Sequence, residues 1–212
     1  MTVTNLREPV ILGLLWLAAL GVSAIGPADR LIWFMEVLPV MVALVLMAAT
    51  QRSFPLTPLL YRLAFLHGLA LILGGHYTYA HVPLGFWFQD MFDLARNPYD
   101  RIGHFFQGFV PALLAREILI RKGFLSRGRM LFFIVTCICL AFSAFYELIE
   151  WWAAAILGQR ADDFLGTQGD VWDTQWDMFM ALTGAVLAQL LLARRHDREM
   201  DEIAAARPAR KD

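Results

Sequence analysis

The chain has 212 residues, of which 58% are hydrophobic and 17% charged, and its formal net charge at pH 7 is -1. Because soluble domains contain about 45–50% apolar residues, this composition excludes an ordinary soluble domain and indicates an integral membrane protein. The near-neutral charge excludes the broad basic surface that attracts nucleic acid. The length allows one compact helical bundle.

Six stretches are long and apolar enough to cross a bilayer, which takes about 20 mostly apolar residues. They cover residues 9–26, 31–49, 59–79, 102–120, 130–152 and 174–193. The first lacks the positive n-region and cleavage site of a signal peptide, so we expect it to be retained as a helix. We therefore predict an all-α fold, a polytopic membrane helix bundle of about six transmembrane helices.

Basic residues gather in the second and fourth connections and after the last predicted helix. They are Arg52, Arg62, Arg116, Arg121, Lys122, Arg127, Arg129, Arg194, Arg195 and Arg198. With six crossings all of them lie on one side of the membrane, and the positive-inside bias makes that side cytoplasmic. Both termini are then cytoplasmic, and the first, third and fifth connections face outward.

The organisation predicted from this pattern is a single integral-membrane helical domain followed by a charged tail. The domain covers residues 1–195, and the cytoplasmic tail covers residues 196–212. The tail is rich in alanine and charged residues, and we expect it to be a frayed helix after Arg194. We detect no internal repeat and no second domain.

The second and third predicted helices carry one acid and two histidines. Glu36 is about one turn inside the outer end of its helix, and we expect it to snorkel or to pair with Arg30, since an ion near the interface escapes most of the bilayer cost. His67, near mid-span, is expected to be a hydrogen-bonded packing residue. His76 lies at the outer end and is a candidate ligand as well as a packing residue.

The third connection, residues 80–100, is polar and aromatic. We expect it to fold over the outer surface as a lid or interfacial segment, because aromatic side chains suit the headgroup zone. It leads into the fourth helix through Asp100 and His104, which are spaced i,i+4 and share a face that Gln107 and Pro111 continue. A carboxylate beside an imidazole can fix its tautomer or hold it charged.

The fifth predicted helix ends in two carboxylates on one face. Glu147 and Glu150 are spaced i,i+3, and Ser143 lies one turn deeper on the same side. Two acids withdrawn from water cannot easily both ionise, so one keeps a proton or a cation lies between them. The alternative is that both snorkel into the headgroups. We favour a functional role because other polar groups converge at this depth.

The fifth connection is rich in turn-forming residues, among them Asp162, Asp163, Gly166 and Gly169. Either Asp170 or Asp173 could cap the last helix. Asp173 and Asp177 are spaced i,i+4 and point the same way. Gly184 lies two turns below Asp177 on that face, and small residues of this kind let membrane helices approach closely.

If the outer ends of the third to sixth helices meet, one pocket gathers these acids and histidines. Carboxylate and imidazole ligands suit a divalent ion such as Mg²⁺, Mn²⁺, Zn²⁺ or Fe²⁺. The predicted metal ligands are His76, His104, Glu147, Glu150, Asp173 and Asp177, and the predicted catalytic residues are Asp100, His104, Glu147 and Glu150. No Glu-x-x-His pair, HExxH motif or phosphate loop is present, so the metal prediction depends on this convergence alone.

Three segments of the chain resemble a known family. They are RNPYDRIGHFFQGF (96–109), SAFYELIEWWAA (143–154) and FLGTQGDVWDTQWDMFMALTGA (164–185). They closely resemble the YjdF-like bacterial inner-membrane proteins, a family of unknown function, and the likeness extends from about Gly74 to Leu190. It implies a multi-pass inner-membrane protein. Asp100, His104 and Glu147 are also loosely similar to a pattern in VanZ-like membrane proteins, from which we transfer no function.

The sequence leaves three functions open. One is an outward-facing, metal-assisted enzyme acting on a lipid-linked or headgroup substrate, with Glu147 or Glu150 as general base and His104 as ligand or acid. The second is a small-solute or proton-coupled transporter, for which intramembrane acids are natural relays. The third is a structural or accessory protein whose polar cluster locks helix packing. The expected partners are membrane lipid and a lipid-linked or small-molecule ligand, with the polar site on the periplasmic side of a bacterial inner membrane.

Overall fold

The computed structural model describes residues 7–157 and 167–206, and within these two ranges the chain is helical and contains no strand. Its elements are α1 (Arg7–Ser23), α2 (Arg30–Thr50), α3 (Pro58–Tyr77), the 3-10 helix η1 (Tyr79–His81), α4 (Pro83–Phe92), α5 (Tyr99–Arg121), α6 (Arg129–Leu157) and α8 (Asp173–Ala206). The predicted all-α fold is confirmed, and each predicted apolar stretch overlaps one long helix. The predicted turn residues Asp162, Asp163 and Gly166 lie outside the described residues.

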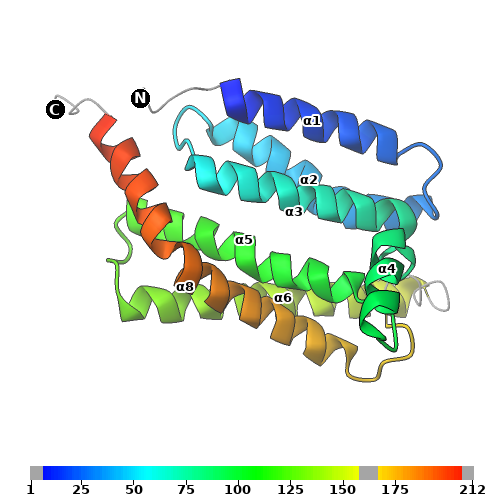
Figure 1. Cartoon of the computed structure of the whole chain (residues 1–212). Coiled ribbons are helices and arrows are strands. Elements are labelled where there is room, and N and C mark those ends of the chain that lie inside the picture. The colour runs from blue at the N-terminus through cyan, green and yellow to red at the C-terminus, as the bar shows by residue number, and fades with distance from the viewer. Residues whose placement is uncertain (1–6, 158–166, 207–212) are drawn as a thin grey trace.

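The six long helices lie lengthwise in two layers, with α1, α2 and α3 in one and α5, α6 and α8 in the other (Figure 1). The first two helices both pack on α3, which packs on α5, and α5 in turn packs on α6 and α8. The most extensive contact is between α5 and α8. Since α5 touches both layers, polar side chains near both of its ends are buried, among them Asp100, His104 and Glu117.

Four of these helices are long and apolar enough to cross a membrane: Arg30–Thr50, Pro58–Tyr77, Arg129–Ile156 and Asp173–Ala206. Large apolar side chains such as Leu46, Phe142 and Leu191 lie exposed on their outer faces, an arrangement that suits a lipid environment. The other two long helices differ for simple reasons. The α1 helix has only 17 residues, and α5 carries charged residues near both ends.

The contact between α5 and α8 is a backbone contact made by two glycines. A Cβ atom on Gly108 would lie 1.8 Å from the carbonyl oxygen of Ala181, and one on Gly184 would lie 2.1 Å from that of Phe105. The predicted close approach at Gly184 is therefore confirmed. It brings the first turns of α8 against the first turns of α5, where the candidate site lies.

Replacing Gly184 with Ala is expected to lower the free energy of unfolding by about 1–3 kcal/mol or more, the usual cost of overpacking. The added methyl group meets backbone atoms of α5, which cannot move aside as a flexible side chain can. The measurement is thermal unfolding in detergent. Gly21→Ala is the matched control, because a Cβ atom there has no heavy atom within 4 Å. Equal stability of the two variants would contradict the close contact.

The last helix does not fray after Arg194. It continues without interruption to Ala206, and His196, Met200 and Ile203 on this part are buried. An ion pair between Arg116 and Asp197, at 2.9 Å, fastens it to α5. The expectation of a frayed helix is therefore wrong up to Ala206.

Candidate functional site

At the end of the bundle where α4 lies (Figure 1), the first turns of α5 and α8 carry buried acids and one imidazole. Asp100 and His104 come from the first turns of α5, and Asp177 comes from the second turn of α8. One ligand atom from each of these three residues lies within 4.8 Å of the other two, and all three residues are buried. Among the described residues, this is the one group of at least three such side chains that converges closely enough for a metal ion. We call it the triad.

Both ring nitrogens of His104 face polar groups. Its Nδ1 lies 3.0 Å from Oε1 of Gln107, a hydrogen bond in which Nδ1–H donates, and 3.8 Å from Oε1 of Glu147. Its Nε2 lies 3.6 Å from Oδ1 of Asp100, beyond hydrogen-bond length. This arrangement leaves the Nε2 lone pair facing the carboxylate, as in a metal-binding imidazole whose second nitrogen is held by an outer partner. The predicted shared face of Asp100, His104 and Gln107 is confirmed.

Several polar atoms of this cluster have no hydrogen-bond partner within residues 7–157 and 167–206. They are Ser143 Oγ, Glu147 Oε1 and Asp177 Oδ1. Asp177 is only 2% exposed, so bulk solvent does not reach its carboxylate. Because nearly all buried polar atoms in proteins are hydrogen-bonded, such atoms indicate a place for a ligand, an ion or an ordered water.

Asp173 has a different partner from the triad. Arg96, in the loop before α5, forms an ion pair with Asp173 and donates to the carbonyl oxygen of Thr167 at 2.8 Å. The same guanidinium lies 3.8 Å from Asp100. Arg101 pairs with Asp170 at 2.6 Å. Two arginines, one in the loop before α5 and one in its first turn, therefore bind the start of α8 and the loop before it. No sequence motif singles out Arg96.

A cavity of about 190 Å³ lies beside the triad and is lined from α2, α3, η1, α5 and α6. Its polar lining residues are Glu36, His67, Tyr79, Asp100, His104, Gln107, Tyr146 and Glu150. Pro39 and Pro111 also line it, and neither has an N–H group to bond the carbonyl four residues earlier in its helix. The cavity thus combines acids, phenols and imidazoles within the bundle.

Glu36 does not snorkel as expected. It is 5% exposed and faces the cavity. Its helix lies close to α3, since a Cβ atom on Gly75 would be 3.1 Å from Cβ of Glu36. The close packing turns this face of α2 inward. The uniformly apolar sequence of α2 does not reveal which face that is.

Neither histidine of α3 belongs to the triad. His76 Nδ1 is 2.8 Å from the carbonyl oxygen of Ser23, which joins α3 to the end of α1. Its ring is not in the converging group of described ligand atoms. His67 packs on Phe106, with ring centroids 6.3 Å apart, as expected of a packing residue. Its Nε2, however, is buried without a hydrogen-bond partner among the described residues.

The opposite end of the bundle holds a second buried polar network, which the sequence did not predict. Glu117, fully buried, accepts hydrogen bonds from the backbone N–H and hydroxyl of Thr57 at 3.1 and 2.8 Å. It also forms an ion pair with Arg121 and lies 2.9 Å from Nε2 of His196. Its carboxylate is therefore fully partnered. A carboxylate partnered in this way suits a structural role. Glu147 Oε1 and Asp177 Oδ1 near the triad differ in having no partner among the described residues, although Arg121 Nη2 at this end also has none.

An apolar layer separates the two polar regions. Val110 and Leu113 of α5 pack there with Leu60 of α3 and with Leu131 and Val135 of α6. The cavity therefore ends inside the bundle on the side of the triad.

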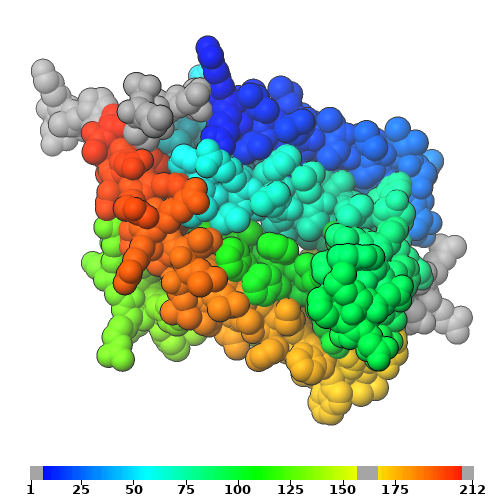
Figure 2. All heavy atoms as spheres, in the orientation of Figure 1, coloured from blue at the N-terminus to red at the C-terminus, as the bar shows by residue number. Residues whose placement is uncertain are grey.

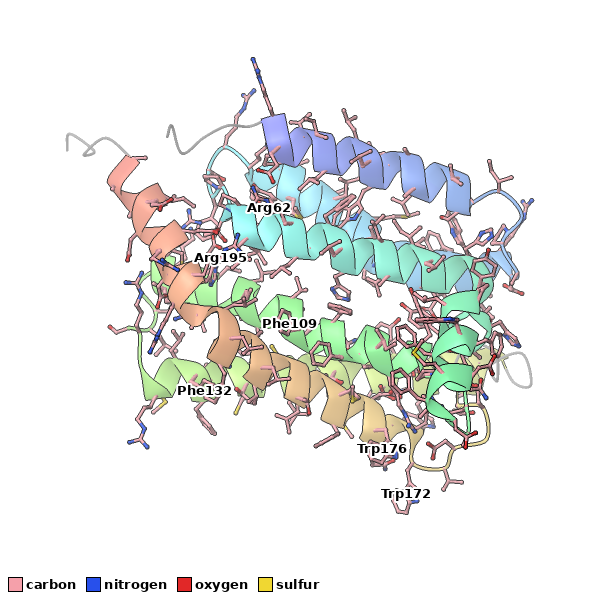
Figure 3. The ribbon with its side chains drawn as sticks, viewed as in Figure 1. Arg62, Phe109, Phe132, Trp172, Trp176 and Arg195 are labelled. Carbon is pink, nitrogen blue, oxygen red and sulfur yellow. The ribbon has the colours of Figure 1, made fainter. Side chains whose placement is uncertain are left out.

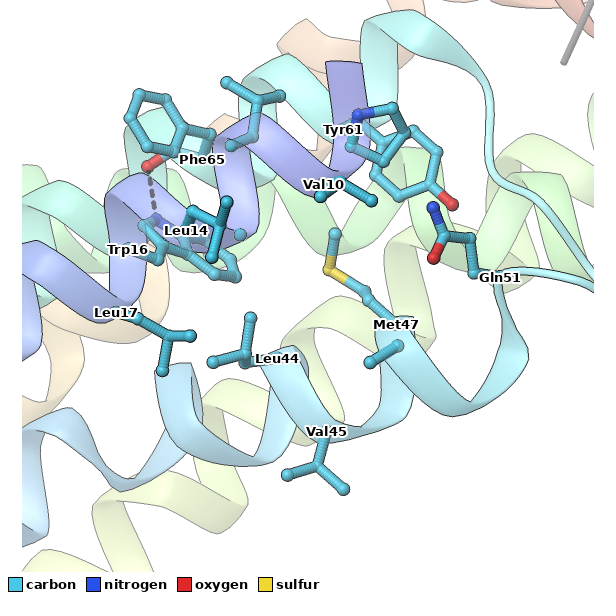
Figure 4. Close-up of a pocket in the computed structure, with 14 residues that line it drawn as sticks. Val10, Leu14, Trp16, Leu17, Leu44, Val45, Met47, Gln51, Tyr61 and Phe65 are labelled. Carbon is cyan, nitrogen blue, oxygen red and sulfur yellow. Dashed lines mark hydrogen bonds between the residues drawn. The ribbon is translucent and has the colours of Figure 1, made fainter. Parts of the chain in front are cut away.

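A larger groove of about 360 Å³ lies on the outside of the bundle, between α1 and α2 with α3 as its floor (Figure 4). Leu14, Leu17 and Leu44 point into it, and the indole of Trp16 donates to the carbonyl oxygen of Phe65 at 2.9 Å. It is lined by apolar side chains apart from Gln51 and Tyr61 at one end. This lining suits lipid acyl chains and offers no catalytic group.

Comparison with known proteins gives the family. The family described as "Predicted membrane protein (DUF2238)" matches residues 8–198. The chain belongs to this family. The inner membrane protein YjdF of Escherichia coli strain K12 is 58% identical over 178 residues, which are 84% of this chain and 85% of that protein. No solved structure matches the chain.

Membership of the family confirms the resemblance found in the sequence. Together with the four apolar helices, it identifies a membrane protein. The match to the DUF2238 family includes Asp100, His104 and Asp177. Because the family description gives a location and no activity, the function has to be argued from the site.

Proposed function

We propose that the protein is a six-pass inner-membrane protein that binds a divalent metal ion at the triad and uses it to act on a lipid-linked or headgroup substrate. The observation that carries this proposal is the convergence of Asp100, His104 and Asp177 within 4.8 Å. Carboxylates and imidazole are both ligands of divalent ions, and a set of three protein ligands leaves further positions for water or substrate.

The proposed topology depends on α1 and α5 crossing the membrane with the four apolar helices, and on where the indole and arginine side chains lie. The α1 and α5 helices run alongside the four apolar ones (Figure 1), so six crossings account for the whole bundle. Trp172 and Trp176 lie at the triad end, and Arg62 and Arg195 lie at the other (Figure 3). Indoles favour the interface and arginines favour the cytoplasmic side. The triad then faces the periplasm.

The short helix α4 supports an approach from the membrane surface. It covers the triad end of the visible face (Figure 2), and Phe86, Trp87 and Phe92 on it are exposed. Aromatic side chains of this kind lie at the headgroup level of a bilayer. The predicted outer connection therefore stands where a lipid headgroup would reach the site.

The residues around the triad would have different roles in the reaction. A bound divalent ion would supply Lewis acidity and an activated water molecule. Glu147, 3.8 Å from Nδ1 of His104, is placed to hold that imidazole in position. Glu150 lines the cavity and is the better placed of the two to accept a proton from a reacting group. The remaining predicted ligands, His76 and Asp173, have partners of their own.

A small-solute or proton-coupled transporter is the second candidate, favoured by the acids and the unpartnered His67 that line the cavity. The apolar layer below the cavity counts against it, because it interrupts a relay toward Glu117. A purely structural role is less well supported, because a packing network gains stability only when its polar atoms are paired.

Metal analysis tests the proposal. Protein purified without chelator and loaded with Mn²⁺ or Zn²⁺ is expected to hold about one ion per chain, and Asp177→Asn is expected to lose most of it, since each lost ligand weakens binding strongly. Asp197→Asn, which removes an acid at the opposite end of the bundle, is the matched control and should keep the ion. No bound ion in the wild-type protein, or an equal content in Asp177→Asn, would contradict the proposal.

A further inference from the structure

The cavity beside the triad is lined by four polar side chains that lie outside the triad. They are Glu36 of α2, Tyr79 of η1, and Tyr146 and Glu150 of α6. Glu36 and Glu150 are 5% and 8% exposed, so their carboxylates are reached from the cavity and not from the molecular surface. His67 Nε2, on the same lining, is buried without a hydrogen-bond partner among the described residues. Buried polar groups that converge on one cavity indicate a ligand with complementary groups.

The charge of the lining selects the kind of ligand. Glu36, Asp100 and Glu150 contribute carboxylates, and none of the described residues that line the cavity is a lysine or arginine. Carboxylates held together away from water cannot all keep their negative charge unless a cation or protons compensate it. A ligand that enters this cavity is therefore favoured if it is positively charged and donates hydrogen bonds.

The geometry argues against a second bare metal ion. Glu36 and Glu150 do not belong to the group of described ligand atoms that converges within 4.8 Å. The volume of about 190 Å³ is many times the roughly 10–15 Å³ that holds one water molecule, so it is far more than one ion fills. The rings of Tyr79 and Tyr146 add faces that attract an organic ammonium group.

We propose that this cavity binds the ammonium group of an amine-bearing ligand between Glu36 and Glu150, with the tyrosine rings beside it. Asp100 and His104 line the same cavity and also belong to the triad, so the amine lies next to the metal ligands. The inference deepens the proposed function and depends on it for the claim that this ligand is the substrate. Its chemistry fits an aminoalkyl lipid headgroup and a free small amine equally.

Ethanolamine is the probe, and ethylene glycol, which has similar size and no ammonium group, is its matched control. The full-length protein is placed in nanodiscs of phosphatidylglycerol, which contains no amine. Titration calorimetry is expected to detect ethanolamine and not ethylene glycol. Glu36→Gln and Glu150→Gln should each raise the dissociation constant about tenfold or more, as expected when a charged hydrogen bond is lost. Asp90→Asn, on the exposed face of α4, should leave it unchanged.

A second arm separates the two sources of the amine. In nanodiscs of mixed phosphatidylethanolamine and phosphatidylglycerol, native mass spectrometry measures which lipid stays bound. Preferential retention of the ethanolamine lipid, lost in Glu150→Gln, indicates the headgroup. Equal retention together with binding of free ethanolamine indicates a free amine. Both results support the ammonium site.

Two outcomes would overturn the inference. One is that the wild-type protein binds ethanolamine and ethylene glycol equally. This test does not depend on the folding of any variant. The other is unchanged ethanolamine binding in folded Glu36→Gln and Glu150→Gln. Asp177→Asn separates this inference from the metal proposal, because it should bind ethanolamine after losing its ion. Ethanolamine binding without any metal in the wild-type protein would refute the proposed function alone.

Discussion

Replacing Glu117 with Ala is expected to lower the free energy of unfolding by about 3–5 kcal/mol, the usual cost of removing one partner from a buried ion pair. The carboxylate is fully buried and joins Thr57 at the start of α3, Arg121 of α5 and His196 of α8. Without it, the cationic Arg121 and the donors of Thr57 and His196 lose their acceptor in a dry interior. Unfolding by SDS titration in mixed micelles measures the change.

Glu8→Ala is the matched control for this prediction. Glu8 also pairs with an arginine, Arg62, at 2.6 Å, but both side chains are largely exposed. Exposed ion pairs contribute about 0.2–1 kcal/mol, so this variant should unfold almost as the wild-type protein does. If Glu117→Ala is no less stable than Glu8→Ala, the network at this end of the bundle does not hold α3, α5 and α8 together.

Much of the fold could be predicted because membrane helices are set by length and composition. Each predicted apolar stretch overlaps a helix of the structure. The helical spacing of Asp100 and His104 correctly placed both on one face, and Gly184 correctly marked a close contact. These inferences need only the periodicity of a helix and the absence of a side chain.

The remaining features depend on which helices become neighbours, and the sequence of one helix does not contain that information. In α2 nearly every position is apolar, so nothing in it distinguishes the inward face of Glu36 from the lipid face. Glu117 stands among basic residues that look like an ordinary cytoplasmic boundary. Arg96 lies in a loop, and its partner Asp173 comes from the start of a distant helix.

The two ends of the central helix α5 differ in how their acidic side chains are partnered. Its last turns carry Glu117, whose carboxylate is fully partnered. Its first turns carry Asp100 and His104 beside unpartnered acids. Groups arranged for binding are often left unsatisfied at a cost in stability. Removing a negative charge is therefore expected to lower the stability of the protein at the Glu117 end and to maintain or raise it at the Asp100 end.

Asp100→Asn is expected to leave the metal-free protein at least as stable as the wild type, because it removes one negative charge from a buried group of acids without changing its size. The variant should instead lose stabilisation by metal. An ion at 100 times its dissociation constant stabilises a folded protein by about 2.7 kcal/mol, and a 100-fold loss of affinity reduces this gain to about 0.4 kcal/mol. SDS titration with and without Mn²⁺ measures both quantities.

The ion pair with Arg96 is the main opposing effect, since its guanidinium lies 3.8 Å from Asp100. Arg96 keeps its ion pair with Asp173, so the loss at Asp100 is expected to be small. A drop in metal-free stability as large as that of Glu117→Ala, together with no effect of Mn²⁺ on the wild-type protein, would mean that the triad serves packing. Greater stability without metal and a lost response to metal is what a binding site requires, because its acids repel one another until the ion is bound.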